Sequence, residues 1–216
     1  MNEHTVKTLA SIEKLRNLRE DLPSLGNAIM HTGSMSMSSM DMVIIGIVKR
    51  CLSTTSALDK LVLEWNMTCA RAVLRMQLDT MLRLSAFWLS SDPQKMAMDF
   101  IAGKQINRMK DKDGCKMTDS YLSRKLGKQF DWIPKVYEYT SSYIHFSERP
   151  FFDSISEINN KERMANFVIN DKDYYFPEFS WVELVDCAAD CLIIIKCFLG
   201  KYRQSKDLVA NKPMKD

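Results

Sequence analysis

Apolar side chains recur at every third or fourth position over most of this chain, a spacing typical of α-helices with one buried face. The segments that carry the pattern span about 3–20, 41–64, 66–90, a short stretch from 93, 118–129, 132–145 and 180–205. The link between the second and third segments is very short. These two helices must therefore lie antiparallel, as an α-hairpin.

Local signals predict where several of these helices begin and end. Pro23 and Gly26 are expected to end the first helix. The expected caps or first residues of the next helices are Ser38 or Ser39, Asn66 or Thr68, Pro93, and Thr118 or Asp119. Ser180 and Glu183 form a capping box that predicts the start of the last helix. The lysine-rich end, 206–216, is expected to fray.

The helical spacing is lost between 151 and 176. Ile155 and Ile158, and then Ala165 and Phe167, flank a polar cluster at 159–162. This arrangement predicts a small β-hairpin or flap near 151–170. The fold prediction is a single, mostly α domain, an up-and-down bundle of about five to seven helices with this hairpin attached.

Composition agrees with a helical globular domain. The 216 residues are 46% hydrophobic and 26% charged, and only 7 are Gly and 6 are Pro, fewer turn residues than an all-β or doubly wound fold needs. Residues 1–20 carry charges throughout, so no export signal is expected. Asp186, Asp190 and Lys196 interrupt the most apolar stretch, 184–199. We expect a cytoplasmic protein that crosses no membrane.

The cysteine pattern indicates reduced thiols. The chain has 6 cysteines and no Cys-x-x-Cys unit, and most of them lie in predicted helices. Cys187 and Cys191 are one helical turn apart and could seat a soft metal, but only 3 histidines are available to complete a site. We expect no metal and no other cofactor.

Positive charge is concentrated in one connector. Residues 104–128 hold eight basic and three acidic side chains, a net +5, whereas the whole chain is +3 and the remainder is therefore −2. Such a segment is typical of an anion-binding face and equally of a solvated connector.

A charged stripe follows the third helix. Arg71, Arg75, Asp79 and Arg83 are four residues apart and share one face of a helix that is otherwise largely apolar. Their surplus positive charge needs carboxylates inside the protein or an anionic ligand. Candidate internal partners are Asp59, Glu64, Glu138 and Asp186.

A second polar set lies at the end of the 132–145 helix. Glu138, Ser141 or Ser142, and His145 fall on one helical face, with Tyr137 and Tyr143 beside them. A carboxylate, a hydroxyl and an imidazole together could support general acid/base chemistry. A histidine in the last turn of a helix can instead cap free carbonyl groups.

We predict that the two sets meet in one partly buried pocket, because each alone would leave charges against an apolar interior. The candidate binding residues are Arg71, Arg75, Asp79, Arg83, Ser141 and Tyr143, and the candidate catalytic residues are His145, Glu138 and Arg75. Replacing Arg75 with alanine should cost about 3 kcal/mol or more if Arg75 pairs internally with a carboxylate. If the pocket is a ligand site, the same change should weaken anion binding with little loss of stability.

Two short motifs carry a family resemblance. Arg75-Met-Gln-Leu-Asp79 with Arg83, and later Tyr139-Thr-Ser-Ser-Tyr-Ile-His145-Phe-Ser147, resemble helical bacterial proteins of HEPN-like pattern, including the AbiV type of abortive-infection protein. The resemblance covers about 41–147. It implies a binding or regulatory module of a bacterial defence or toxin-antitoxin system, which holds a nucleic acid, another anion or a protein.

The alternative that the resemblance implies is a metal-independent ribonuclease using His145. HEPN ribonucleases carry an arginine with four to six residues between it and the catalytic histidine. The matching positions here are Glu138, Tyr139 and Thr140. Cleavage would therefore need Arg75 or Arg83 to enter from the neighbouring helix. A homodimer is the expected oligomer in either case.

Overall fold

The computed structural model describes residues 3–33, 37–145 and 147–210. Four long helices form a bundle, and they are α1 (Val6–Met30), α2 (Ser39–Leu63), α3 (Met67–Leu89) and α8 (Glu178–Ala210). The shorter elements are α4 (Pro93–Ile101), the 3-10 helix η1 (Ile106–Arg108), α5 (Asp119–Gly127), α6 (Trp132–Ser141), α7 (Glu148–Asp153), β1 (Ile155–Asn159) and β2 (Met164–Phe167). The described part of the chain thus holds eight α-helices and one hairpin, which confirms the mostly α fold.

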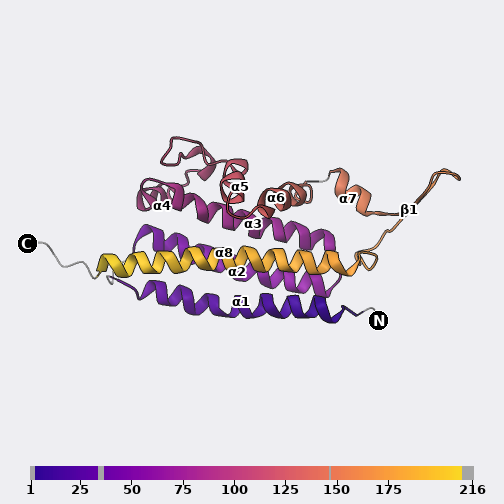
Figure 1. Cartoon of the computed structure of the whole chain (residues 1–216), viewed down its shortest axis with the longest axis horizontal. Coiled ribbons are helices and arrows are strands. Elements are labelled where there is room, and N and C mark those ends of the chain that lie inside the picture. Colours follow the sequence, from indigo (N-terminus) through magenta and orange to yellow (C-terminus); the bar gives the residue numbers. More distant parts are fainter. Residues whose placement is uncertain (1–2, 34–36, 146, 211–216) are drawn as a thin grey trace, which may run out of the picture.

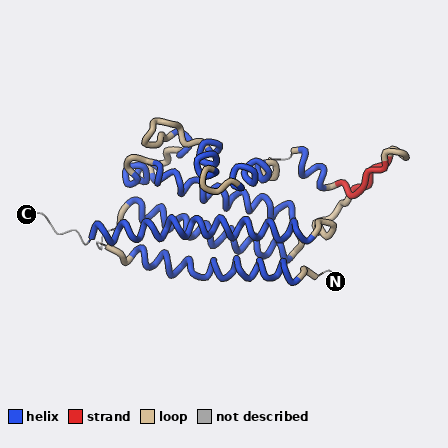
Figure 2. Tube along the Cα trace, in the orientation of Figure 1, coloured by secondary structure: helices blue, strands red, loops and turns tan. Residues whose placement is uncertain are grey.

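The helices are arranged in two layers. The four long helices lie side by side, and α4, α5 and α6 cover the outer face of α3 (Figure 1). The segment 93–177 leads the chain from the end of α3 back to the end of the bundle at which α1 begins. Helix α8 therefore runs parallel to α1. The ion pairs Lys14 with Asp190 and Lys196 with Asp21 link α1 to α8 in this register. Figure 2 shows the two strands in an arm that extends from one end of the bundle.

The bundle core is apolar and fully buried. Side chains without exposed surface come from all four long helices, for example Leu22, Val62, Leu78 and Ile195. Trp181, the largest fully buried side chain, closes the core near the start of α8. Burial of this common face, rather than local propensity, stabilises the long helices. Among the described residues, no helix is both long enough and apolar enough to cross a membrane.

Most helix starts match the predicted caps. Ser38 caps α2 and, with Asp41, forms a capping box; Asn66 caps α3, Thr118 caps α5, and Pro93 occupies the first turn of α4. The predicted end of the first helix at Pro23 and Gly26 is wrong, because α1 continues to Met30. Leu22, Gly26 and Ile29 are buried on both sides of the proline. Their packing outweighs the one hydrogen bond that proline removes.

The last helix is longer than predicted at both ends. It begins at Glu178, so Ser180 lies inside the helix and its backbone N–H bonds the carbonyl of Pro177 at 3.0 Å. The capping box prediction is therefore wrong. Residues 206–210 are helical, so the predicted frayed end begins too early, and 211–216 lie outside the described residues.

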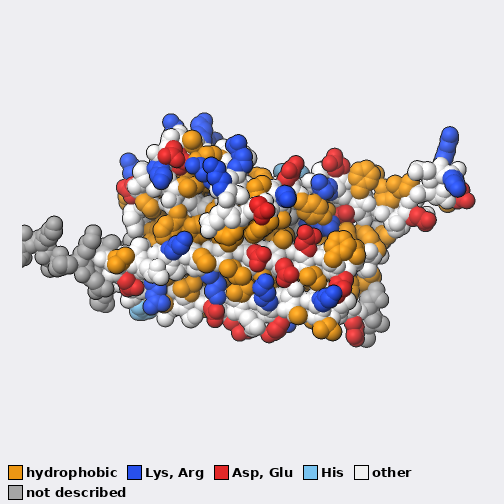
Figure 3. All heavy atoms as spheres, in the orientation of Figure 1, with side chains coloured by type: hydrophobic (Ala, Val, Ile, Leu, Met, Phe, Trp, Pro, Cys, Tyr) orange, Lys and Arg blue, Asp and Glu red, His pale blue; other side chains and the backbone are white. Residues whose placement is uncertain are grey.

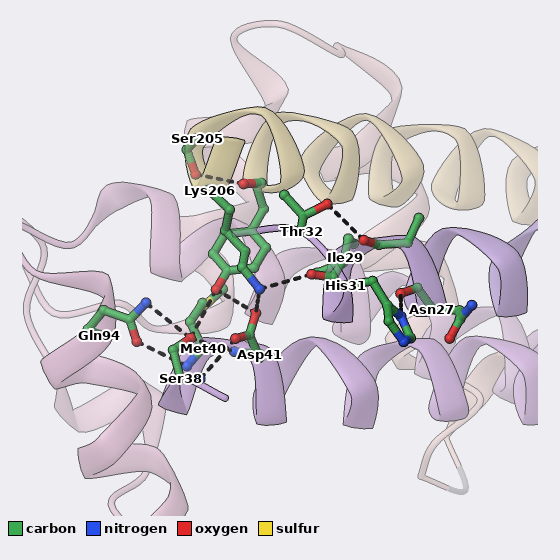
Figure 4. Close-up of polar contacts among 12 residues, drawn as sticks. Asn27, Ile29, His31, Thr32, Ser38, Met40, Asp41, Gln94, Ser205 and Lys206 are labelled. Atoms are coloured by element: carbon green, nitrogen blue, oxygen red, sulfur yellow. Dashed lines mark hydrogen bonds and ion pairs between the residues drawn. The ribbon is translucent and has the colours of Figure 1, made fainter. Parts of the chain in front are cut away.

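A buried carboxylate explains why the helix continues through residue 206. Lys206 donates to Asp41 Oδ1 at 2.9 Å and to the carbonyl of Ile29 at 2.9 Å (Figure 4), and so ties α8 to the ends of α1 and α2. Tyr202 also donates to Asp41, at 2.9 Å. Burial alone would raise the pKa of Asp41, but the hydrogen bonds from Lys206, Ser38 and Tyr202 together lower it below its ordinary value.

The predicted hairpin is confirmed. β1 and β2 are antiparallel, with Ile158 opposite Ala165 and Asn159 opposite Met164. Arg163, in the connecting turn, has a φ of 53°, in the left-handed region that a tight turn uses. The side chains of β2 are exposed, so the hairpin adds little to the core.

Candidate functional site

The charged stripe of α3 lies on the face that the second layer covers. Leu74, Leu78 and Leu82 are buried in the bundle core, while the polar stripe faces α5 and α6. Both layers exclude most water from this face, which makes an unpaired charge costly there. The polar groups must then find partners within the protein.

Asp119 neutralises two arginines of the stripe. It lies in the first turn of α5, where the helix dipole favours a carboxylate. Its carboxylate forms an ion pair with Arg83 Nη2 and lies 3.8 Å from Arg75 Nη2. Arg83 also bonds Asp79 at 3.3 Å. The internal ladder is thus present, but none of its partners is among the carboxylates predicted from the sequence.

Arg71 is the most buried cation of the stripe, with 6% of its surface exposed. Its Nη1 donates to Asp153 Oδ2 at 2.6 Å and to Tyr143 Oη at 2.7 Å. Its guanidinium lies 4.5 Å from the ring of Phe176, 4.9 Å from that of Tyr143 and 5.3 Å from that of Tyr139. Arg71 therefore links α3 to α6, α7 and the start of α8.

The predicted meeting of the two polar sets is correct for one end of the stripe. Arg75 Nε donates to Ser141 Oγ at 3.3 Å, and its guanidinium lies 4.3 Å from the Tyr137 ring. No described contact joins Asp79 or Arg83 to α6, because Asp119 of α5 lies at that end of the stripe. The single predicted pocket is therefore divided.

His145 stands apart from the candidate catalytic set. α6 ends at Ser141, and residues 142–145 form turns, so the predicted helix to 145 is too long. The side chains of Glu138 and His145 are exposed, and no hydrogen bond among the described residues joins either of them to Ser141. Ser141 instead donates to the carbonyl of Tyr137 at 2.6 Å.

A cavity of about 830 Å³ opens at the Arg71 end of the stripe, between α3, α6, α7 and the start of α8. Its apolar and aromatic walls include Leu74, Val136, Tyr139, Phe176 and Phe179. Its charged side chains are three cations, Arg71, Lys135 and Arg149, and three carboxylates, Glu138, Asp153 and Glu183. We call this cavity the Arg71 pocket.

Only some of these charges are paired. Asp153 holds Arg71, whereas Arg149 and Lys135 have no carboxylate within 4.0 Å among the described residues. The Arg149 guanidinium lies 4.8 Å from the Tyr139 ring. Arg149 and Lys135 are exposed, and so their donors are free to meet a ligand. Arg149 and Ser147 lie just beyond the polar set of 138–145 in the sequence, but no charge spacing links Arg149 or Lys135 to the stripe.

Tyr143 is a permanent donor in the wall next to this pocket. Burial raises its pKa far above the ordinary value of 10, and the hydrogen bonds with Tyr139 and Asp153 raise it further. Its hydroxyl donates to Asp153 at 2.8 Å. The Tyr143 hydroxyl thus stays protonated at neutral pH and serves as a structural hydrogen-bond donor to Asp153.

The thiols and the basic connector complete the candidate sites. All six cysteines are free, and burial raises the pKa of Cys51 and of Cys187 to about 12. Among the described residues, no group of three His, Cys, Asp or Glu side chains could hold a metal ion, so Cys187 and Cys191 lack further ligands.

Figure 3 shows that basic side chains of 104–128 gather at the outer edge of the second layer, where most are exposed.

Comparisons of the chain with models of protein families, with curated proteins and with solved structures find no match. The HEPN-like resemblance therefore stays a prediction that rests on the two motifs.

Proposed function

We propose that this protein is a binding module whose Arg71 pocket takes a nucleotide, either free or at the end of a nucleic acid strand. The observation that carries the proposal is the pair of unpaired cations, Arg149 and Lys135, beside a cavity with aromatic walls. Guanidinium and ammonium groups bind phosphate oxygens. Aromatic side chains provide surfaces on which a base can stack.

The carboxylates that line the Arg71 pocket restrict the kind of anion that can bind there. Glu138 and Glu183 line the same cavity and are exposed, so they would repel a bare inorganic anion. They can accept hydrogen bonds from ribose hydroxyls or from the amino groups of a base. A ligand with an anionic group at one end and hydrogen-bond donors at the other suits this mixture of charges better than phosphate alone.

The pair of the buried Arg71 and the half-buried Asp153 has a positioning role in this proposal. The carboxylate of Asp153 already neutralises the Arg71 guanidinium, so Arg71 does not supply the positive charge that would bind the phosphate. It holds Tyr139, Tyr143 and α7 in place, and α7 carries Arg149. The resemblance implies that such a module acts in a bacterial defence or toxin-antitoxin system, and the expected homodimer stays a prediction that sedimentation can check.

Calorimetric titration with nucleoside monophosphates and with inorganic phosphate tests the proposal. We expect the nucleotides to bind more tightly than phosphate. Arg149→Ala should weaken nucleotide binding about tenfold or more, because a hydrogen bond to a charged group contributes roughly 1.5–3 kcal/mol. Arg203→Ala is the matched control, since Arg203 is an exposed arginine of α8 about 24 Å along the helix from the pocket residue Cys187.

Two results would overturn the proposal. One is the absence of nucleotide binding at millimolar concentration. The other is an equal loss of affinity in the Arg149 and Arg203 variants, which would show that the charge of the protein as a whole attracts the ligand. Incubation of the protein with an RNA oligonucleotide separates binding from the ribonuclease alternative, because binding alone leaves the strand intact.

A further inference from the structure

A second cavity, of about 780 Å³, lies at the opposite end of α3. It is a groove between α2, α3, α4 and η1 and shares no lining residue with the Arg71 pocket. Its apolar lining comes from all four elements: Met42, Val43, Ile47, Phe87, Phe100, Ile101 and Ile106. A ligand in this groove would bind independently of the proposed nucleotide site.

The groove changes from apolar to cationic along its length. Helices α2 and α3 are antiparallel, and Arg50 Nε donates to Thr80 Oγ1 at 2.9 Å. Met42 lies eight residues earlier in α2, about 12 Å away along the helix. The apolar end holds Phe87 of α3, and Phe100 of α4 also lines the groove. One end therefore presents a guanidinium and the other presents hydrocarbon.

Arg50 is the cation of the groove that has no carboxylate partner. Arg83 also lines the groove, but Asp79 and Asp119 pair with it. Arg50 has no carboxylate within 4.0 Å among the described residues, and its one described hydrogen bond uses Nε. Its two terminal amino groups remain available. A guanidinium in this state favours a planar carboxylate, which matches its paired donors.

Gly46 keeps the middle of the groove open. It lies inside α2, where glycine is less favourable than alanine, and a Cβ placed there would meet no atom within 4 Å. The packing of the protein therefore does not explain the glycine. Three large apolar side chains of the groove, Met42, Phe100 and Ile101, are also 50%, 42% and 48% exposed. A ligand that lies along the groove would cover them.

We propose that this groove binds a medium-chain fatty acid, with the carboxylate on Arg50 and the alkyl chain directed past Gly46 toward Phe87 and Phe100. An extended chain of roughly ten carbons spans the length of about 12 Å between Arg50 and Met42. The cavity volume lies within the range of small-molecule sites. The free cation supplies the charge complementarity that fixes the direction of the chain.

Titration with decanoate, below the concentration at which it aggregates, tests the site. Gly46→Leu should abolish binding, because Gly46 lines the groove where a Cβ meets no atom within 4 Å, and a leucine there would occupy the open space. Gly46→Ala is its control and should bind decanoate within a factor of about three of the unmodified protein. Arg50→Gln should weaken decanoate binding at least tenfold and leave the binding of 1-decanol unchanged.

Circular dichroism and nucleotide titration of each variant show whether it folds and whether the Arg71 pocket is intact. The proposal is overturned if decanoate does not bind the unmodified protein, or if the folded Gly46→Leu variant binds it as well. Equal losses for decanoate and 1-decanol in Arg50→Gln would overturn the carboxylate assignment. A groove that takes an amphipathic peptide but not decanoate would also refute the fatty acid.

Discussion

Replacing Arg71 with methionine tests which arginine of α3 is structural. Methionine keeps much of the length of the side chain but removes the charge and the donors. The change leaves Asp153 without its cation, and breaking a buried pair costs about 3–5 kcal/mol. The low end applies here, since the Asp153 side chain is 21% exposed and keeps the hydrogen bond from Tyr143. We expect a loss of about 3 kcal/mol in the free energy of unfolding.

Arg75→Met is the matched control on the same helix. Arg75 lies 3.8 Å from Asp119, whose carboxylate keeps its ion pair with Arg83 after the change. The loss should be about 1 kcal/mol, typical of a partly exposed pair together with one cation–π contact. This value revises the 3 kcal/mol expected from the sequence for Arg75→Ala.

Guanidinium denaturation followed by circular dichroism measures both losses, and hydrogen exchange adds a local readout. None of the residues of α7 is buried, and Asp153 is its link to Arg71. Exchange over 148–153 should therefore rise in the Arg71 variant and stay unchanged in the Arg75 variant. A loss of less than about 1 kcal/mol in Arg71→Met, or an equal loss of stability in the two variants, would contradict the structural role of Arg71.

Three further outcomes follow from single residues. Asp41→Asn should lower the free energy of unfolding by about 3 kcal/mol at pH 7, because it breaks the buried pair with Lys206. The folded-state pKa of Asp41 is lowered. Its contribution to stability is therefore complete above the unfolded pKa of about 4 and is lost as the pH falls through the folded value. In urea titrations, the free energies of unfolding of the variant and the unmodified protein should differ by a constant amount above pH 5 and converge below pH 4. Gly46→Ala should raise the melting temperature, with a gain of about 1 kcal/mol, and a destabilised variant would mean that the helix needs the glycine. His145→Ala should leave nucleotide affinity unchanged in calorimetry, because His145 does not line the Arg71 pocket; a tenfold loss would bring the imidazole into the site.

The helix boundaries show which features of the fold are local. The caps at Ser38, Asn66 and Thr118 were predictable because a cap needs only a side chain and an amide two or three residues away. The end of α1 was not, because Pro23 is a local stop signal that tertiary burial overrides. The capping box predicted at Ser180 is also wrong. The spacing from Ser180 to Glu183 is that of a capping box, yet the helix starts earlier, at Glu178.

In the candidate site, too, the sequence predicts local features but not contacts between residues far apart in the chain. The spacing of the α3 stripe is visible in the sequence, and so is its need for countercharge. The partners are not, because Asp153 is 82 residues from Arg71 in the chain and no periodicity connects them. Only the return of the chain over α3, through α5, α6 and α7, brings the carboxylates to the stripe.

The charge balance of the stripe decides where ligands can bind. Three arginines of α3 face three aspartates, Asp79, Asp119 and Asp153, so the stripe has no surplus charge left for an anion. A buried, paired arginine would lose its protein partner on binding a ligand, and that loss offsets the gain. Free charge lies instead on flanking elements, at Arg149 beside one cavity and at Arg50 beside the other. The stripe therefore holds the two layers together and contributes to the walls of both cavities, while exposed cations beside these cavities are the groups that can take a ligand.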